Sequence, residues 1–409
     1  MLNRKLRVLL IISYYHMLVY GLMPTTLKIG NCDLAIAKVS AGYMIYSVFL
    51  TVVLLLEVPC MMLGGLFSGY MRNNIVLQWA LIVGLMVRII AILSCYGLVW
   101  LQRQRLIQLY RDFLVHWRAH WQILCRVAGE ESLERMQLIL AGVLRRNLCI
   151  NYAMLCCSIL MQYRLLSSGN RLQLLMHAAA MLMVSVGRIG FFTLLLLLNH
   201  QFLAVQLSLQ ALCRRVRSRS QEDLRRIAGI HAEWVILARR AFSIYDVANA
   251  SIFLNMFAVN VNILYHAVQF ANQTIESDSW GFLIGDGLIV FNFWNSALIM
   301  NMLDSAINSC NDSAQLVKQF NNLHTLSPES EKEVCQFSKF KPLFQICPFC
   351  LQLELFVIHL RNNRLVYRIC GCVVLDKPAC LGYLATVLCH VIFLMQFDLK
   401  RRYEEGLTN

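Results

Sequence analysis

Apolar runs dominate the chain, and each is about as long as the roughly 20 helical residues needed to cross a bilayer. Short polar turns or longer basic segments separate them. Unbroken apolar stretches of this length are typical of transmembrane helices. The seven clearest runs are Val39–Met62, Ile75–Trp100, Leu148–Leu166, Leu172–Leu198, Ala248–Ala271, Phe282–Met302 and Ala379–Phe397. Two further candidates are the N-terminal run Leu6–Met23 and the weaker run Leu351–Val374.

The composition favours the same class of protein. Of the 409 residues, 58% are hydrophobic and 15% are charged, whereas a soluble domain is roughly half apolar and a quarter charged. We therefore expect a polytopic membrane protein embedded in a lipid bilayer. The net charge of +14 fits basic connections between spans, and nucleic acid is not an expected partner because no basic and aromatic groove pattern occurs.

The basic residues predict which way the chain crosses the membrane. Arg and Lys concentrate in every second connection, within 101–147, 212–235 and 311–376, and such connections stay on the cytoplasmic side. The other connections are short and poor in charge. With seven spans starting at Val39, the N-terminus is then inside and the C-terminus outside. The sequon at Asn272 lies in a connection placed outside, so Asn272 is a candidate glycosylation site.

The basic connections carry a helical pattern of their own. In Arg103–Val127, the apolar positions include Leu106, Leu109 and Phe113, which share one helical face. We therefore expect an all-α polytopic membrane protein with seven transmembrane helices and cytoplasmic helical extensions. The expected segments are a cytoplasmic N-terminal segment with an apolar helix (1–37), six spans with two helical connections (38–310), a cytoplasmic anchor region (311–376), the last span (377–399) and a short external tail (400–409).

Several ionisable residues lie inside the apolar spans. Because a charge in lipid is costly, such residues normally face a bundle interior or a water-filled cavity. A ligand pocket or ion path is one explanation, and buried charges that hold helices together are the other. The residues are Glu57, Arg88, Arg188, Asp286 and Asp304.

A pocket near the outer side is the best candidate for ligand binding. Asp286 follows the outer end of its span, beside Trp280 and Phe282, and Tyr265 and His266 approach the same side from the preceding span. Aromatic residues with a few polar groups suit a small-molecule cavity, although aromatic belts at membrane interfaces have the same composition.

The sequence predicts neither an enzyme nor a metal or cofactor site. Cys347 and Cys350 have the spacing of half a zinc or redox site, but a zinc site usually needs a second pair or partner histidines. The sequence has no glycine-rich phosphate loop, HExxH motif or nucleophile elbow.

The end of the last run resembles a known family. Insect gustatory receptors end their last helix with Thr-Tyr, five hydrophobic residues and Gln-Phe. Here the five hydrophobic residues Val391–Met395 precede Gln396 and Phe397, while Cys389 and His390 stand in the Thr-Tyr positions. The preceding "RLVYRICGCVVLD" resembles the family's approach to this helix. The number of spans, the chain length and the long basic connections are also similar over nearly the whole chain.

The resemblance implies a function. Members of this family look like tetrameric, ligand-gated, non-selective cation channels of sensory neurons, in which each subunit contributes its last helix to a central pore. It also implies a plasma-membrane protein, a small-molecule tastant in an outward-facing pocket, permeating cations, and assembly with itself or with other family members. A bitter or aversive compound is the favoured tastant, with sugars second.

The helical period predicts which residues would line such a pore. Positions i, i+4, i+7 and i+8 share a face, and from Cys389 these are Phe393, Gln396 and Phe397. Rings of phenylalanine would close the pore by dewetting, and Gln396 amides would replace part of a cation's hydration. A G-protein-coupled receptor with an external N-terminus and a transporter remain alternatives.

Overall fold

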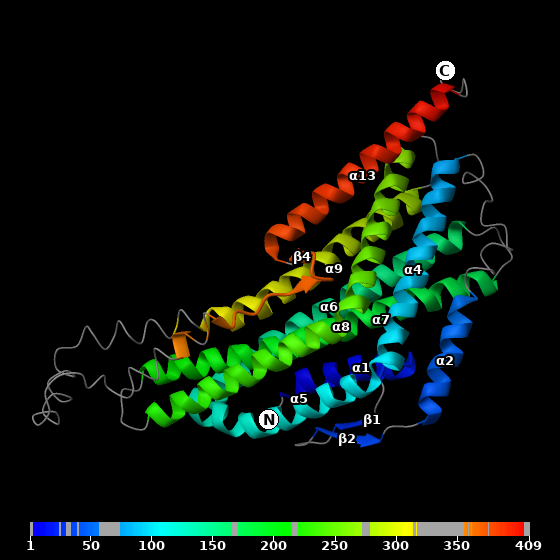
Figure 1. Ribbon diagram of the computed structural model, residues 1–409. Helices are drawn as coiled ribbons and strands as arrows, with labels where there is room; N and C mark the ends of the chain where they lie inside the picture. Colours follow the sequence, from blue (N-terminus) through cyan, green and yellow to red (C-terminus); the bar gives the residue numbers. More distant parts are fainter. Residues whose placement is uncertain are drawn as a thin grey trace, which may run out of the picture.

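The computed structural model consists almost entirely of long helices (Figure 1). The described residues are 3–23, 26–29, 34–38, 41–56, 74–165, 171–214, 220–271, 279–313, 316, 356–358, 360, 362–374 and 376–404. The helices are α1 (Arg4–Val19), α2 (Ala41–Leu55), α4 (Ile75–Leu101), α5 (Arg103–Ala128), α6 (Glu130–Leu165), α7 (Arg171–Arg214), α8 (Ser220–Ala271), α9 (Ser279–Asn311) and α13 (Lys377–Glu404). The strands are β1 (Thr26–Ile29), β2 (Leu34–Lys38), β3 (Arg368–Ile369) and β4 (Val373–Val374).

The predicted polytopic helical fold is confirmed. Within the described residues, 6 helices are long and apolar enough to cross a membrane, namely α4, α6, α7, α8, α9 and α13. The shorter apolar helix Gly42–Leu55 corresponds to the first predicted span. The cores of the seven predicted spans therefore all fall on helices.

Several helices are much longer than a bilayer is thick. Helices α6, α7 and α8 have 36, 44 and 52 residues, and at 1.5 Å per residue the longest extends for about 78 Å. The hydrocarbon core is about 30 Å thick. The first two basic connections are thus helical over their described residues, as predicted. The first consists of α5 and the start of α6, and the second includes the end of α7 and the start of α8.

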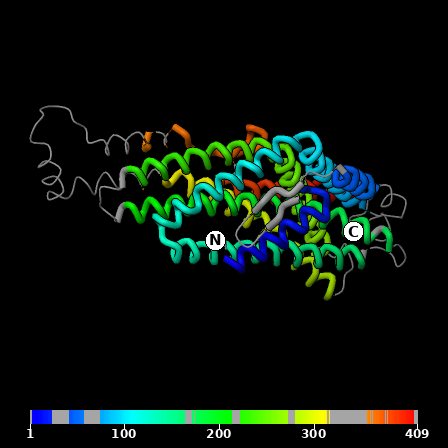
Figure 2. The backbone as a smooth tube through the Cα atoms, turned by 90° about the horizontal axis from the view of Figure 1, so that it is seen from below, coloured from blue at the N-terminus to red at the C-terminus, as the bar shows by residue number. Residues whose placement is uncertain are grey.

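The helices pack side by side along their length. Helices α6, α7, α8 and α9 form one elongated bundle, with α5 packed on α7 and α8 (Figure 1). Helix α1 packs against α6 and α7 (Figure 2). The hydrophobic core also continues into the helical extensions beyond the apolar spans. Trp234, in the extension of α8, is fully buried against Phe113 of α5, with ring centroids 5.1 Å apart.

Three parts of the chain differ from the expected outline. The weak span candidate Leu351–Val374 is not a transmembrane helix over its described part, since β3 and β4 form an antiparallel pair there. Cys370 and Gly371 have φ values of 48° and 72°, which form the tight turn between the strands and prevent a continuous helix. The expected N-terminal segment contains the antiparallel pair β1 and β2 after its helix.

The last helix is also longer than expected. Helix α13 continues beyond the predicted end at residue 399 to Glu404, so residues 400–404 are helical rather than a separate tail. It lies against α8 and α9 at one end of the molecule (Figure 1). In the most apolar 18-residue stretch of α13, 11% is buried inside the structure. The corresponding stretch of α7 is 78% buried. Most of the last helix therefore faces away from its own subunit.

Candidate pore helix and its contacts

Helix α13 has one face that packs on the bundle and one that does not. The packed positions recur every three or four residues, which is the helical period. Val387 and Val391 are buried at 0% and 4% exposure beside Val261 of α8. The packed face comprises Tyr383, Val387, Val391, Leu394, Asp398 and Arg402. This apolar contact sets the rotation of α13, and hence which residues point outward.

Polar contacts hold the middle of α13 to the bundle. The hydroxyl of Tyr383 accepts a hydrogen bond of 2.7 Å from the side-chain amide of Asn260 on α8. The same amide lies 3.4 Å from the hydroxyl of Ser296 on α9. His390 of α13 packs edge-on against Phe257 of α8, with ring centroids 5.1 Å apart. Three helices therefore meet around Asn260, which is fully buried.

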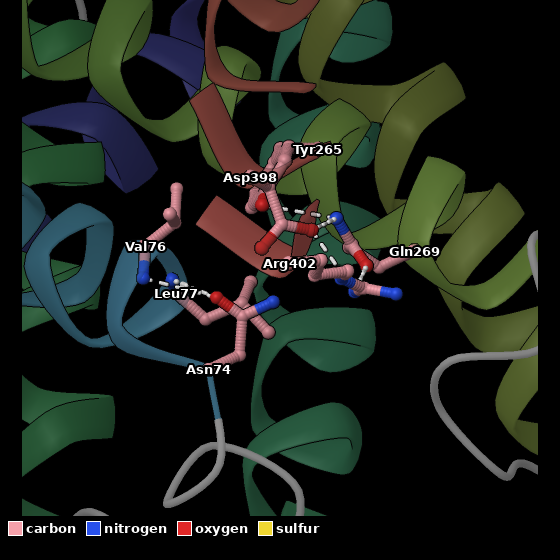
Figure 3. Close-up of polar contacts among 7 residues, drawn as sticks. All are labelled: Asn74, Val76, Leu77, Tyr265, Gln269, Asp398 and Arg402. Carbon is pink, nitrogen blue, oxygen red and sulfur yellow. Dashed lines mark hydrogen bonds and ion pairs between the residues drawn. The ribbon is translucent and has the colours of Figure 1, made fainter. Parts of the chain in front are cut away.

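A second polar contact holds the far end of α13 (Figure 3). The buried carboxylate of Asp398 accepts a hydrogen bond of 2.9 Å from the Gln269 amide and forms a 2.9 Å ion pair with Arg402. Arg402 also donates to the Gln269 side-chain oxygen at 3.0 Å, and Gln269 donates to the Tyr265 hydroxyl at 2.9 Å. The carboxylate is thereby satisfied although it is only 4% exposed.

The same cluster extends to the start of α4. Tyr265 is fully buried against Val76 and Leu77, the second and third residues of α4. The side chain of Asn74 caps this helix by accepting hydrogen bonds from the backbone amides of Val76 and Leu77 at 2.9 and 3.2 Å (Figure 3). The ends of α4, α8 and α13 are thus joined by one set of contacts.

The four predicted pore residues all lie on the outward face of α13. Phe393 and Phe397 are 64% and 56% exposed, and Cys389 and Gln396 are also exposed. The prediction required these positions to be free of contacts within one subunit. Their role in a pore stays a prediction, because a membrane-facing helix would expose the same residues.

The five predicted pocket residues are not all brought together. Tyr265 belongs to the buried contact between α4, α8 and α13, and His266 is half-buried. Trp280 and Phe282 of α9 are 67% and 52% exposed, and Asp286 is exposed. Trp280 lines a wide groove of about 630 Å³ between α6 and α9, together with Cys157, Leu160, Tyr163, Leu283, Ile284, Gly287 and Phe291. Asn272 lies outside the described residues.

Two of the ionisable span residues are buried and hydrogen-bonded inside the bundle. A guanidinium nitrogen of Arg88 on α4 lies 3.0 Å from the His177 ring on α7. Arg188 of α7 donates to the hydroxyl of Ser185 at 2.9 Å. Arg88 and Arg188 are 6% and 5% exposed. Both arginines therefore face the bundle interior, as is usual for ionisable residues in membrane spans.

Of the other three ionisable span residues, Asp304 is buried and accepts a hydrogen bond of 2.9 Å from Asn308. Asp286 is exposed, and Glu57 lies outside the described residues.

A further polar pair was not anticipated. The side chains of Asn151 on α6 and Asn295 on α9 exchange hydrogen bonds of 3.2 and 3.1 Å in the buried interior. Asparagines are common in sequences, so only the helix packing reveals this pair.

Comparison with known families decides between the receptor classes. A model of the 7tm chemosensory receptor family matches residues 10–340 and 348–401. The chain belongs to this family. Its members are receptors rather than enzymes, as the sequence predicts.

Two relatives of this chemosensory receptor are similar over nearly its whole length. It is 42% identical over 407 residues to the candidate gustatory receptor 58b of Drosophila melanogaster, covering 98% of this chain and 95% of the relative. It is 27% identical over 406 residues to the candidate gustatory receptor 58a of the same fly, covering 94% and 96%. The resemblance to gustatory receptors is thereby confirmed.

Solved structures show the same fold. The insect olfactory receptor OR5 of Machilis hrabei in complex with eugenol superposes with a TM-score of 0.64 at 10% sequence identity, over 96% of this chain and 98% of that one. A second structure of the same olfactory receptor gives a TM-score of 0.61 at 12% identity. The chemosensory receptor fold therefore persists at a level of identity where few side chains are shared.

Proposed function

We propose that this chemosensory receptor is a subunit of a tetrameric, ligand-gated, non-selective cation channel that a small-molecule tastant opens. The observation that carries the proposal is the exposed face of α13. A helix of 28 residues, about 42 Å long, packs on its subunit along one side only. Its other side presents Phe393 and Gln396 outward, and a glutamine is a costly side chain to leave against lipid tails.

Four copies of α13 around an axis would place these residues in a pore wall. Phenylalanine rings of Phe393 or Phe397 would close the pore by dewetting, and the Gln396 amides would replace part of a cation's hydration shell. A tastant opens such a pore only if it binds the open state more tightly than the closed state. The contacts around Asn260 and Asp398 would transmit the change, because they join α13 to helices of the ligand-binding bundle.

The proposed ligand class rests on a receptor of the same fold. The olfactory receptor of the same fold is described in complex with eugenol, which supports a small organic molecule as the ligand class. We propose a bitter or aversive tastant, with a sugar second. The binding region would lie among the outward ends of α8 and α9, where Tyr265, His266, Trp280, Phe282 and Asp286 were predicted.

The surroundings of the protein complete the proposal. We place the receptor in the plasma membrane of a sensory dendrite, with its N-terminus inside and its C-terminus outside, as homo- or hetero-tetramers with family members. Epitope tags at the two ends of the chain, probed in intact cells, test the orientation. An accessible N-terminal tag and a protected C-terminal tag would contradict it.

Electrical recording tests the channel itself. The receptor is expressed in cells that lack family members, alone and with candidate partners, and screened against a tastant panel. We expect tastant-evoked currents that reverse near 0 mV in mixed Na⁺ and K⁺ solutions, and single-channel events that exceed a transporter's turnover. We expect Phe393→Ala to raise the current without ligand, and Gln396→Ala to change ion selectivity.

A matched control on the same helix separates a pore role from general damage. Leu384 of α13 is 39% exposed. It lies nine residues before Phe393 and therefore points about 180° away from it around the helix. Leu384→Ala should leave evoked current, leak and selectivity unchanged. If Phe393→Ala and Gln396→Ala behave like Leu384→Ala, α13 does not line the conducting path.

A further inference from the structure

Three metal-ligating side chains converge between α5 and α8, outside the pore helix and its contacts. His116 and His120 of α5 and Glu233 of α8 place one ligand atom each within 4.8 Å of one another. His116 Nδ1 and His120 Nε2 lie 3.0 and 2.9 Å from the same carboxylate oxygen, Glu233 Oε2. The two helices pack side by side in this region (Figure 1).

The arrangement has the geometry of a zinc site. Residues four apart on a helix lie on the same face, so the rings of His116 and His120 stack with centroids 5.3 Å apart. Two imidazole nitrogens and a carboxylate oxygen are a known donor set for Zn²⁺, with bonds of about 2.0–2.2 Å. Tetrahedral angles at such bond lengths separate the ligand atoms by about 3.3 Å, so only small side-chain shifts would admit an ion.

The packing around the three residues restricts their movement. The indole of Trp234, the residue after Glu233, contacts the His116 and His120 rings edge-on, with centroids 6.1 Å away in each case. His120 is 7% exposed. Burial, the largest of the influences on this ring, lowers the pKa of His120 below its usual 6.5.

The outer side of the cluster is open to solvent. The side chains of His116 and Glu233 are 30% and 47% exposed. A metal ion can reach the cluster from this side, and a water molecule can complete four-coordination, as in zinc sites with three protein ligands.

We propose that His116, His120 and Glu233 form a binding site for a divalent transition-metal ion of the zinc class. The ion joins α5 to α8. Helix α8 continues from Glu233 to Gln269, the residue that contacts the end of α13. The site therefore lies on the helix that supports the last span, in its extension beyond the apolar segment. The proposal concerns this chain's metal binding and does not depend on the channel function.

Metal titration of the purified full-length receptor in detergent tests the proposal. The protein carries Cys347→Ser and Cys350→Ser, because a cysteine pair of this spacing would compete for the same metals. After treatment with a chelator, the receptor is titrated with Co²⁺, whose visible absorption reports four-coordinate binding, and then with Zn²⁺ as the competitor. We expect one Co²⁺ per chain with a spectrum of nitrogen and oxygen ligands, displaced by Zn²⁺.

Single substitutions assign the ligands. His116→Gln, His120→Gln and Glu233→Gln should each weaken Zn²⁺ binding more than about 100-fold, since loss of a mere outer-shell partner already costs about 10–100-fold. Glu222→Gln is the matched control, because Glu222 is an exposed glutamate of the same helix that pairs with Arg226. It should bind Zn²⁺ like the parent protein.

Thermal unfolding separates metal binding from a purely hydrogen-bonded cluster. Zn²⁺ should raise the melting temperature of the parent protein and of Glu222→Gln, and should leave that of Glu233→Gln unchanged. His116→Gln alters a partly exposed ring and serves as the second variant if His120→Gln does not fold. The proposal is overturned if the parent protein shows no Co²⁺ absorption band, or if His116→Gln and Glu233→Gln bind Zn²⁺ as tightly as it does.

Discussion

Asp398 and Gln269 are 129 residues apart in the chain, and their side chains form a 2.9 Å hydrogen bond where α13 meets α8. The bond satisfies a carboxylate at the end of an otherwise apolar helix. Arg402, one turn further along α13, completes the contact as the counter-ion. Gln396 and Phe397 precede this anchored turn, so the contact sets the height and rotation at which they face outward.

The first prediction concerns this contact. Asp398→Asn removes the charge that pairs with Arg402 while keeping the size of the side chain. We expect a loss of about 1–3 kcal/mol of stability, the usual cost of leaving a buried polar group without its partner. We also expect a shifted tastant dose-response curve. Thermal unfolding and whole-cell currents measure the two effects.

Lys400 provides the control for this change. Its ion pair with Glu404 is exposed on both sides, at 75% and 62%, and exposed pairs contribute little. Lys400→Gln should therefore leave both measurements within error of the parent protein. Equal effects of Asp398→Asn and Lys400→Gln would contradict the anchoring role of Asp398.

The second prediction concerns the middle of α13. Tyr383→Phe removes the hydroxyl that accepts a hydrogen bond from Asn260 and keeps the ring. We expect a loss of about 1 kcal/mol and an increase in current without ligand, because α13 is held less firmly in one position. Tyr403, on the same helix, is 78% exposed, so Tyr403→Phe should change neither quantity.

The third prediction tests the buried asparagine pair. In Asn151→Ala and Asn295→Ala, the remaining amide loses its partner in the bundle interior, so each change should cost about 1–3 kcal/mol. The double variant should cost less than the sum of the two single changes, with a coupling of about 0.5–3 kcal/mol. Chemical or thermal unfolding of all four proteins measures the coupling. Strict additivity would show that the two side chains do not interact.

The fourth prediction tests the electrostatics of the proposed pore. Gln396→Glu would place a ring of carboxylates in a tetrameric pore, and such rings favour cations. We expect higher permeability to divalent cations relative to Na⁺, measured from reversal potentials under ion substitution. Leu384 is exposed on the same helix and points about 120° away from Gln396 around it, so Leu384→Gln should not shift the reversal potential. An unchanged reversal potential in Gln396→Glu would argue against a pore position.

The fifth prediction concerns the extension of the bundle. Trp234 fills the space between α5 and α8 and is fully buried. Trp234→Ala should cost about 3–5 kcal/mol, seen as a lower melting temperature. Ile236, two residues along the same helix, is 66% exposed. Ile236→Ala should have little effect, and a similarly large effect would show that the exposed side of α8 is covered by another surface.

The spans and the helical nature of the first two basic connections could be predicted from the chain alone, because these properties are local. An apolar run of bilayer length identifies a span, and the repeat of Leu106, Leu109 and Phe113 identifies the packed face of α5. The same period placed Cys389, Phe393, Gln396 and Phe397 on one face of α13. Each inference uses residues within a few turns of one another.

Partners from distant segments required the tertiary structure. Asp398 finds Gln269, Asn151 finds Asn295, and Glu233 meets His116 and His120 only because particular helices lie side by side in one register. Hydrogen bonds and ion pairs form over about 3 Å, whereas a one-residue slip moves a helix by 1.5 Å and turns it by 100°. Hydrophobic periodicity tolerates such a slip. The pairing of these polar groups does not, and it therefore depends on how the whole bundle packs.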